Sequence, residues 1–218
     1  MFTHGTLTIE RYALGPFQTN CYIARGPGHA PAVFDCGIDP GPLLDRLDEL
    51  KASEGEPAAF ALTHAHIDHI AGLREARHRF PGSPIWIHSA EREWLLDPEQ
   101  NLSASAGIPV TAPAADRLLE HGETLELAGH AWEVRHTPGH SPGGVAFVCA
   151  DVGVAIVGDA LFSGSIGRTD FPGSSFERLE RSIREQLYTL DPGVAIYPGH
   201  GPESTIGQEM RGNEFVRG

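Results

Sequence analysis

The sequence predicts an α/β fold in which two facing β-sheets carry helices on their outer sides. Apolar and polar residues alternate over several short runs, and this period of two is typical of strands. Runs with helical spacing follow the strands of each β-rich half of the chain. Since each sheet must bury one face, we expect the two sheets to pack against each other with the helices outside.

The first half opens with a predicted β-meander, at residues 7–12, 19–24 and 32–35, divided by glycine and proline turns. A helix is predicted over 42–52, where Leu43, Leu44, Leu47 and Leu50 share one face. A short apolar strand at 58–62 follows. A helix over 68–80 is predicted next, because its first turn is acidic, its end is basic and Pro81-Gly82 stops it.

The later elements repeat this scheme. We expect a strand at 84–88, a helix at 90–96, strands at 124–127, 132–136, 144–149 and 152–157, a helix at 175–190 and a strand at 194–197. The polar loop at 101–113 is predicted to border the substrate. No long linker, low-complexity tract or short repeat interrupts the chain, so a single domain over 1–218 is expected.

Composition narrows the class of protein. Twenty-nine acidic residues against sixteen basic ones give a formal charge of −13, which disfavours binding to nucleic acid or to anionic membranes. Cys21, Cys36 and Cys149 form no CxxC pair and lie in apolar runs, so buried free thiols are predicted. No signal peptide and no apolar run of ~20 residues is found, and a cytoplasmic location is expected.

The strongest local signal is the run from Thr63 to His69, directly after the predicted strand at 58–62. If the chain stays extended through His66, His64 and His66 point to the same side and both imidazoles can reach one ion. Asp68 and His69 can serve a neighbouring ion, with Asp68 favoured by the positive end of the helix that begins there. Three histidines and an aspartate so close together predict a site for zinc, iron or manganese.

Three further segments place an isolated ligand-type residue beside glycine at the end of a predicted strand. They are Pro138-Gly139-His140, Gly158-Asp159 and Pro198-Gly199-His200. Glycine permits a close backbone approach, and the preceding strand holds the ligand rigidly. Each segment alone is typical of an ordinary loop, and only their combination indicates a metal site.

These four segments, in this order, resemble the signature of the metallo-β-lactamase superfamily over nearly the whole chain. The resemblance implies a four-layer αββα sandwich with two mixed sheets and the site at one edge. It also implies that His64, His66 and His140 hold a first metal, that Asp68, His69 and His200 hold a second, and that Asp159 bridges them. The cofactor implied is a pair of divalent ions, zinc before iron or manganese.

Such a pair shares a hydroxide, because coordination lowers the pKa of bound water towards ~7. The implied reaction is therefore hydrolysis of an ester-like bond, with Asp68 as a catalytic residue that orients the hydroxide. The partner is a small-molecule substrate. The oligomeric state, monomer or dimer, stays open.

The run from Gly158 to Phe171, together with Pro198-Gly199-His200-Gly201-Pro202-Glu203-Ser204-Thr205, is similar to the small bacterial type II glyoxalases. These enzymes hydrolyse S-2-hydroxyacylglutathione thioesters to a hydroxy acid and glutathione. Longer members carry a carboxy-terminal helical domain with basic glutathione contacts. This chain ends eighteen residues after His200, so that domain is expected to be absent and another thiol carrier is possible.

Two residues beside the ligands have alternative interpretations. Arg168 is a candidate to bind a substrate carboxylate through its planar guanidinium, and the alternative is a structural pair with Asp170. Asp35 occupies a position that in the family supports the site from behind the ligands, and the alternative is a turn residue. A structural role is predicted for His88 and His136.

Other functions stay open within the same fold. A persulfide dioxygenase would hold one iron with His64, His140 and Asp159, and it also resembles this chain at Gly167-Arg168-Thr169-Asp170-Phe171. A lactonase or a β-lactamase is a further alternative, although the expected lack of a secretion signal disfavours the β-lactamase. A module that binds metal without catalysis would keep the whole ligand set unused.

Overall fold

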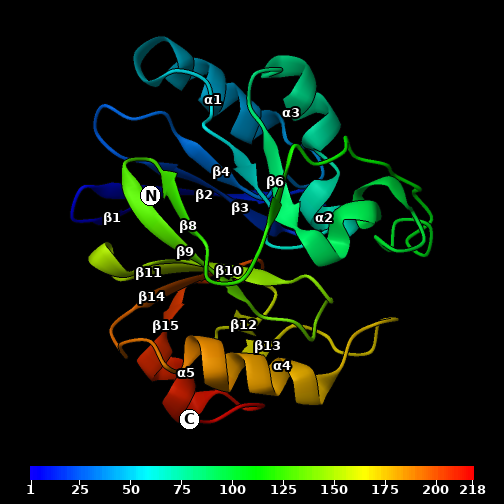
Figure 1. The fold of residues 1–218 in the computed structure, drawn as a ribbon, viewed down its shortest axis with the longest axis vertical. Coiled ribbons are helices and arrows are strands. Elements are labelled where there is room, and N and C mark those ends of the chain that lie inside the picture. The colour runs from blue at the N-terminus through cyan, green and yellow to red at the C-terminus, as the bar shows by residue number, and fades with distance from the viewer.

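Two β-sheets face each other in the middle of the computed structural model, which describes residues 1–218. In Figure 1, α1 (Gly41–Glu54) and α3 (Leu73–Arg79) cover the outer side of one sheet, and α4 (Phe176–Ser182) and α5 (Ile206–Gly212) cover that of the other. The layers are therefore helix, sheet, sheet and helix. The predicted four-layer αββα sandwich is confirmed.

Both sheets are mixed, as expected. The first sheet has the order β1 to β7, antiparallel from β1 to β4 and parallel from β4 to β7. Its strands are β1 (Phe2–His4), β2 (Leu7–Leu14), β3 (Thr19–Arg25), β4 (Ala32–Phe34), β5 (Phe60–Ala61), β6 (Ile85–His88) and β7 (Arg117–Leu119).

The second sheet has the order β15-β14-β11-β10-β9-β8, with only the β11–β14 pair parallel. Its strands are β8 (Thr124–Leu127), β9 (His130–His136), β10 (Val145–Cys149), β11 (Val154–Gly158), β14 (Ala195–Pro198) and β15 (Ser204–Thr205). A small ribbon of β12 (Leu161–Phe162) and β13 (Ser165–Ile166) follows β11.

Alternation along the strands separates the inner core from the outer ones. In β4, Phe34 faces the second sheet and Val33 faces the helices. The Phe34 ring lies 4.9 Å from that of Trp132 and 5.0 Å from that of Phe147, centroid to centroid. Since burying one such side chain contributes roughly 1.5–3 kcal/mol, this inner cluster holds the sheets together.

The predicted helix over 68–80 is wrong as a single element. The chain forms α2 (Ile67–Ile70) and α3, interrupted at Ala71-Gly72. The Gly72 N–H donates to the Cys36 carbonyl at 2.9 Å, and a Cβ at Gly72 would lie 2.5 Å from the Gly37 carbonyl oxygen. This close contact with the chain after β4 redirects the helix, and local sequence does not reveal it.

Two other helices differ in type or length from their expected form. Residues 89–96 form a 3-10 helix, η1 (Ser89–Leu96), and the helix expected over 175–190 continues from α4 as one π-helical stretch, η3 (Ile183–Leu187). A third short element, the 3-10 turn η2 (Ala150–Val152), joins β10 to β11. The strands β1, β7, β12, β13 and β15 and the helix α5 were not predicted, because all are short.

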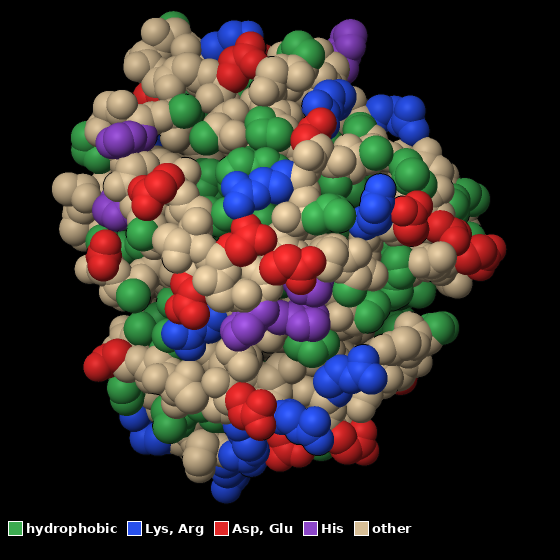
Figure 2. All heavy atoms as spheres, viewed as in Figure 1, with side chains coloured by type: hydrophobic (Ala, Val, Ile, Leu, Met, Phe, Trp, Pro, Cys, Tyr) green, Lys and Arg blue, Asp and Glu red, His purple; other side chains and the backbone are tan.

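All three cysteines are buried and free, as predicted. None of the helices has both the length and the hydropathy needed to cross a bilayer. Figure 2 shows acidic and basic side chains interspersed over one face of the molecule, so the net negative charge is not gathered there into a single band.

Candidate metal centre

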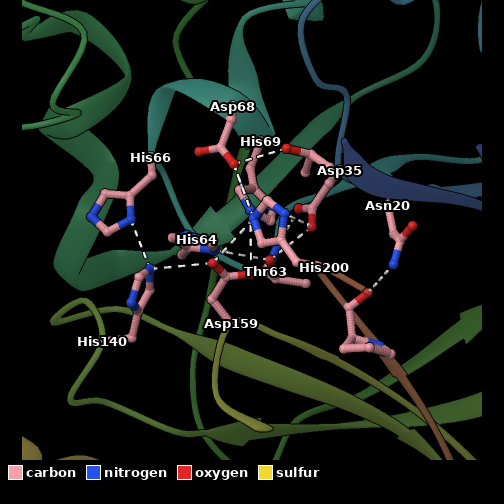
Figure 3. Close-up of polar contacts among 12 residues, drawn as sticks. Asn20, Asp35, Thr63, His64, His66, Asp68, His69, His140, Asp159 and His200 are labelled. Carbon is pink, nitrogen blue, oxygen red and sulfur yellow. Dashed lines mark hydrogen bonds and ion pairs between the residues drawn. The ribbon is translucent and has the colours of Figure 1, made fainter. Parts of the chain in front are cut away.

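The seven predicted ligands meet at one edge of the sandwich, where strands of both sheets end. His64 and His66 follow β5, Asp68 and His69 lie in α2, and the loop after β9 carries His140. Asp159 follows β11 and His200 follows β14 in the second sheet. Figure 3 shows these side chains pointing towards a common centre. The cluster therefore belongs to both sheets, and neither sheet alone contains it.

Within the cluster the ligand atoms form three overlapping groups of three, and two of these groups share no residue. The nitrogens of His64, His66 and His140 lie within 4.8 Å of one another, and so do the ligand atoms of Asp68, His69 and His200. These are the same two triplets that the sequence resemblance implies.

Asp159 lies between the two groups. Its Oδ2 is 3.6 Å from His140 Nε2 and 3.4 Å from His200 Nε2, and its Oδ1 is 3.4 Å from His69 Nε2. A carboxylate in this position can contact an ion in either group.

Three buried polar atoms of the cluster have no hydrogen-bond partner: His64 Nε2, His69 Nε2 and Asp159 Oδ1. Leaving such atoms unpaired costs ~1–3 kcal/mol each. The three belong to residues whose ligand atoms lie within 4.8 Å of one another. Imidazole nitrogens and carboxylate oxygens that converge in this way fit a divalent cation.

In three of the histidines, the ring nitrogen opposite the centre is held by another group. His69 Nδ1 donates to Asp35 Oδ2 at 2.8 Å, and His140 Nδ1 donates to the Arg168 carbonyl at 2.8 Å. His200 Nδ1 lies 3.2 Å from the Phe17 carbonyl. Such bonds fix the tautomer and leave each Nε2 lone pair directed at the centre.

Asp35 supports the site from behind its ligands, as one of its two predicted interpretations states. Its Oδ1 accepts the Thr63 N–H and its Oδ2 accepts the Thr63 hydroxyl, both at 2.8 Å, in addition to the bond from His69. Its backbone has φ of 62°, a conformation that aspartate tolerates better than most residues. Asp35 thus joins the end of β4 to the first residue of the ligand run.

The charges within the cluster balance one another. Burial opposes ionisation of Asp159, but His69 and His200 outweigh burial and hold the pKa of this carboxyl well below its usual range. Burial also opposes protonation of His200, but Asp159 and Asp68 outweigh it and raise the pKa of that imidazole to about 9. The raised pKa of His200 favours its protonated form beside these carboxylates, and a divalent cation would supply positive charge at the same place.

Gly199 meets the requirement for close approach that the sequence predicted. A Cβ at this position would lie 2.0 Å from Asp159 Oδ1 and 2.8 Å from His69 Cε1. Only glycine therefore lets the β14 loop pass beside two ligands at once.

A pocket of about 450 Å³ opens directly onto the cluster. His66, Asp68, His140, Asp159 and His200 form its floor. Its walls include Phe17, Leu102, Phe162, Ile166 and Phe171. Leu102, Ser105 and Ala106 come from the loop at 101–113, which was predicted to border the substrate.

Arg168 lines this pocket, but its guanidinium is engaged. Nε and Nη2 donate to the two Asp170 oxygens at 2.9 and 2.8 Å, and the group lies 4.4 Å from the centre of the Phe171 ring. The predicted structural pair therefore exists. Both side chains are about two-thirds exposed, and exposed pairs of this kind are weak.

His88 and His136 lie outside the cluster and join the two sheets. Their rings stack at 4.1 Å with an angle of 11°, one from β6 and the other from β9. His88 Nδ1 also accepts the Ala90 N–H at the start of η1. These contacts agree with the predicted structural role.

A two-sheet sandwich with helices outside and a histidine–aspartate cluster at one edge defines the metal-binding metallo-β-lactamase fold. The chain belongs to the metallo-β-lactamase superfamily, whose family model matches residues 14–200. The cluster is thus the divalent-metal site of a metallo-hydrolase.

Its relatives support this assignment. The chain is 35% identical to the hydroxyacylglutathione hydrolase GloC of Haemophilus influenzae, over 96% of this chain and 98% of that protein. It is 38% identical to a solved structure described as the BLEG-1 B3 metallo-β-lactamase, with a TM-score of 0.90 over 97% of this chain and all of that one. A structure of TTHA1623 in a di-iron-bound form is 35% identical, with a TM-score of 0.80 over 95% and 100% of the two chains.

Proposed function

We propose that this protein is a dinuclear metal-dependent thioesterase, which hydrolyses S-2-hydroxyacyl thioesters such as S-2-hydroxyacylglutathione to a hydroxy acid and a free thiol. The observation that carries the proposal is the complete pair of ligand triplets around Asp159 at the floor of the pocket. GloC, which shares 35% of the sequence over nearly the full length, is named for this reaction.

The first ion would be held by His64, His66 and His140, the second by Asp68, His69 and His200, and Asp159 would contact both. When bound, two divalent ions supply hydroxide at neutral pH and polarise a carbonyl group. We propose zinc as the native metal. Iron and manganese accept the same ligands, and TTHA1623 has been solved with two irons.

The chain's own groups would bind and orient the substrate. Burial opposes ionisation of Asp68, but His69 and His200 outweigh burial and hold its pKa at about 2, so this carboxylate accepts hydrogen bonds at neutral pH. One oxygen, Oδ2, already accepts the Thr19 hydroxyl at 2.8 Å, and Asp68 lines the pocket. We assign to Asp68 the orientation of the attacking water.

The apolar walls would exclude bulk water from the reacting carbonyl, which strengthens the electrostatic contacts at the floor. Arg168 would bind a carboxylate of the thiol carrier by exchanging it for Asp170. The reaction adds water across the thioester, so the acyl carbon gains the oxygen and the sulfur leaves with a proton. Three buried thiols agree with a reducing cytoplasm as the site of action.

The first experiment follows thioester loss from S-lactoylglutathione by purified protein that has been loaded separately with zinc, iron or manganese. Turnover that a chelator abolishes, and that is lost in His64→Ala and Asp159→Ala, supports the proposal. His78→Ala is the matched control, because His78 is exposed in α3 and is not one of the clustered ligand residues. Absence of turnover by the fully metallated protein, with several thiol carriers, would overturn it.

A β-lactam amide is the second candidate bond, because BLEG-1 is described as a B3 metallo-β-lactamase and covers nearly the whole chain. The same metal-loaded samples are therefore tested with a chromogenic cephalosporin. Cleavage of the cephalosporin with no thioester loss would replace the thioesterase proposal by this second one.

A further inference from the structure

Asn20, at the start of β3, holds the loop that carries His200. Its backbone N–H donates to the Gly199 carbonyl at 2.7 Å, and its side-chain Nδ2 donates to the carbonyls of Pro198 and Gly201, at 3.0 and 2.8 Å. The side chain is only 2% exposed. Figure 3 shows this amide pointing at the loop beside the cluster. One residue of the first sheet therefore binds three backbone carbonyls of segment 198–201, which carries His200 in the second.

Other residues of the same segment reach the same half of the cluster. The Tyr22 hydroxyl donates to the Pro198 carbonyl at 2.6 Å, and the Thr19 hydroxyl donates to Asp68 Oδ2 at 2.8 Å. The Phe17 carbonyl lies 3.2 Å from His200 Nδ1. Residues 17–22 thus contact Asp68 and His200 or the loop around His200. None of these bonds reaches His64, His66 or His140.

Glu91 holds the loops that carry the other triplet, His64, His66 and His140. This carboxylate in η1 is fully buried, and its two oxygens accept the N–H groups of Ala65 and Gly143, at 2.6 and 2.7 Å. Ala65 separates His64 from His66, and Gly143 lies three residues after His140. A Cβ at Gly143 would lie 2.8 Å from Glu91 Cγ, so the contact is close-packed. Glu91 therefore ties together the two loops that carry the first triplet.

We propose that Asn20 and Glu91 are positioning residues for different halves of the cluster, so that each sets the metal affinity of its own triplet. The inference rests on the proposed two-metal function. When a supporting residue is removed, the ligands that it held bind metal ~10- to 100-fold more weakly. Metal binding must then also order these ligands, which costs free energy. Because the two supports share no residue, loss of one should weaken a single metal position.

The test measures zinc affinity by equilibrium dialysis, with protein-bound zinc determined by mass spectrometry. Two backgrounds isolate the positions: His140→Ala leaves the Asp68/His69/His200 triplet, and His200→Ala leaves the His64/His66/His140 triplet. In the first background we expect Asn20→Ala to weaken zinc binding at least ~10-fold and Glu91→Gln to change it less than ~3-fold. In the second background the order is reversed.

A milder pair of variants protects the test against misfolding. Tyr22→Phe removes only the hydroxyl that donates to Pro198, and we expect it to weaken the Asp68/His69/His200 position alone. Tyr188→Phe is the matched control, since its buried hydroxyl donates to the Val216 carbonyl at 2.6 Å, away from the cluster. Thermal unfolding of the metal-free variants measures their folding separately.

Equal weakening of both positions by Asn20→Ala or Tyr22→Phe, or no weakening of either, would overturn the inference. Dialysis needs no substrate, so this outcome is independent of whether the wild type cleaves thioesters. Conversely, a wild type that binds two zinc ions but cleaves no thioester would refute the proposed reaction and leave the two supports standing.

Discussion

Asp35 and His69 form a solvent-excluded pair in which His69 Nδ1 donates to Asp35 Oδ2 at 2.8 Å. The bond directs the opposite nitrogen, Nε2, towards Asp68 and Asp159, at 3.5 and 3.4 Å. Asp35, at the end of the β-meander, therefore fixes the ring orientation of His69, a metal ligand more than thirty positions later in the sequence.

Asp35→Asn should lower zinc affinity ~10- to 100-fold, because an amide accepts the His69 and Thr63 bonds less well than a carboxylate. Activity should fall at limiting zinc and recover in excess zinc. Competition with a chromogenic chelator measures the change. Asp39→Asn is the control, since Asp39 is exposed and also has a positive φ, 55°. Equal affinities for Asp35→Asn and wild type would contradict this role.

Gly199→Ala should reduce thioester hydrolysis ~100-fold, since the added methyl group displaces Asp159 and His69, and an error of about 1 Å costs about that factor. Gly41→Ala is the matched control, because a Cβ at Gly41 meets nothing within 4 Å and its φ is not positive. Steady-state kinetics and metal content test both variants. Wild-type turnover by Gly199→Ala would show that the close approach is not needed.

Metal removal should destabilise the fold. Zinc at a hundred times its Kd stabilises the folded state by ~2.7 kcal/mol, which for a chain of this size is a shift in Tm of roughly 5–10 °C. Calorimetry with and without a chelator measures the shift. In His64→Ala the chelator-dependent shift should be smaller, and an unchanged shift there would place the stabilising metal elsewhere.

Because of His88, the free energy of unfolding should decrease as the pH falls below neutral. Burial and the stacked His136 lower the pKa of His88 below its ordinary value of 6.5. The unfolded chain therefore binds the proton more readily, so this contribution is present above pH 6.5 and is lost as the pH falls below it. Protonation at Nδ1 also breaks the bond from the Ala90 N–H.

His88→Phe should accordingly lower stability at pH 8 but flatten its decline between pH 7 and pH 5. Urea unfolding across this range measures both effects, with His78→Phe as an exposed control. If His88→Phe keeps the wild-type slope, another group is responsible for the acid sensitivity.

Arg168→Gln should raise KM for S-lactoylglutathione and leave KM unchanged for a thioester without a carboxylate, such as one of N-acetylcysteamine. Asp170→Asn should lower KM for the carboxylate-bearing substrate, because it frees the guanidinium. Steady-state kinetics with both substrates separates the two roles. A rise in KM for both substrates would indicate that the Arg168–Asp170 pair acts only by shaping the pocket.

Elements whose apolar pattern extends over many residues were predictable from the sequence. Contacts between segments far apart in the sequence were not. The helix at 42–52 and the strands of the meander followed from the spacing of their apolar residues, and the structure contains them as α1, β2, β3 and β4. The helix over 68–80 failed because the contact of Gly72 with Cys36 breaks it. The unpredicted strands β1, β7, β12, β13 and β15 have two or three residues each, and no longer apolar run surrounds them.

The metal ligands were predictable because histidine and aspartate residues stand beside glycines at the ends of predicted strands. The residues that support these ligands have no such sequence pattern. Glu91 in the predicted helix at 90–96 looks like any solvent-facing glutamate, and Asn20 looks like a polar residue in a strand. Their partners are backbone groups of distant loops, and backbone groups are the same for every sequence.

The sequence by itself therefore determined the chemistry: which side chains can bind metal, and in which strand-end segments they lie. The resemblance implied the two triplets and the place of Asp159, and it left the role of Arg168 open. Only the tertiary structure decided that Arg168 is paired with Asp170 and that separate residues support each half. The physical reason is that ligand identity is a property of single side chains, whereas convergence depends on two sheets packing in one register around Phe34, Trp132 and Phe147.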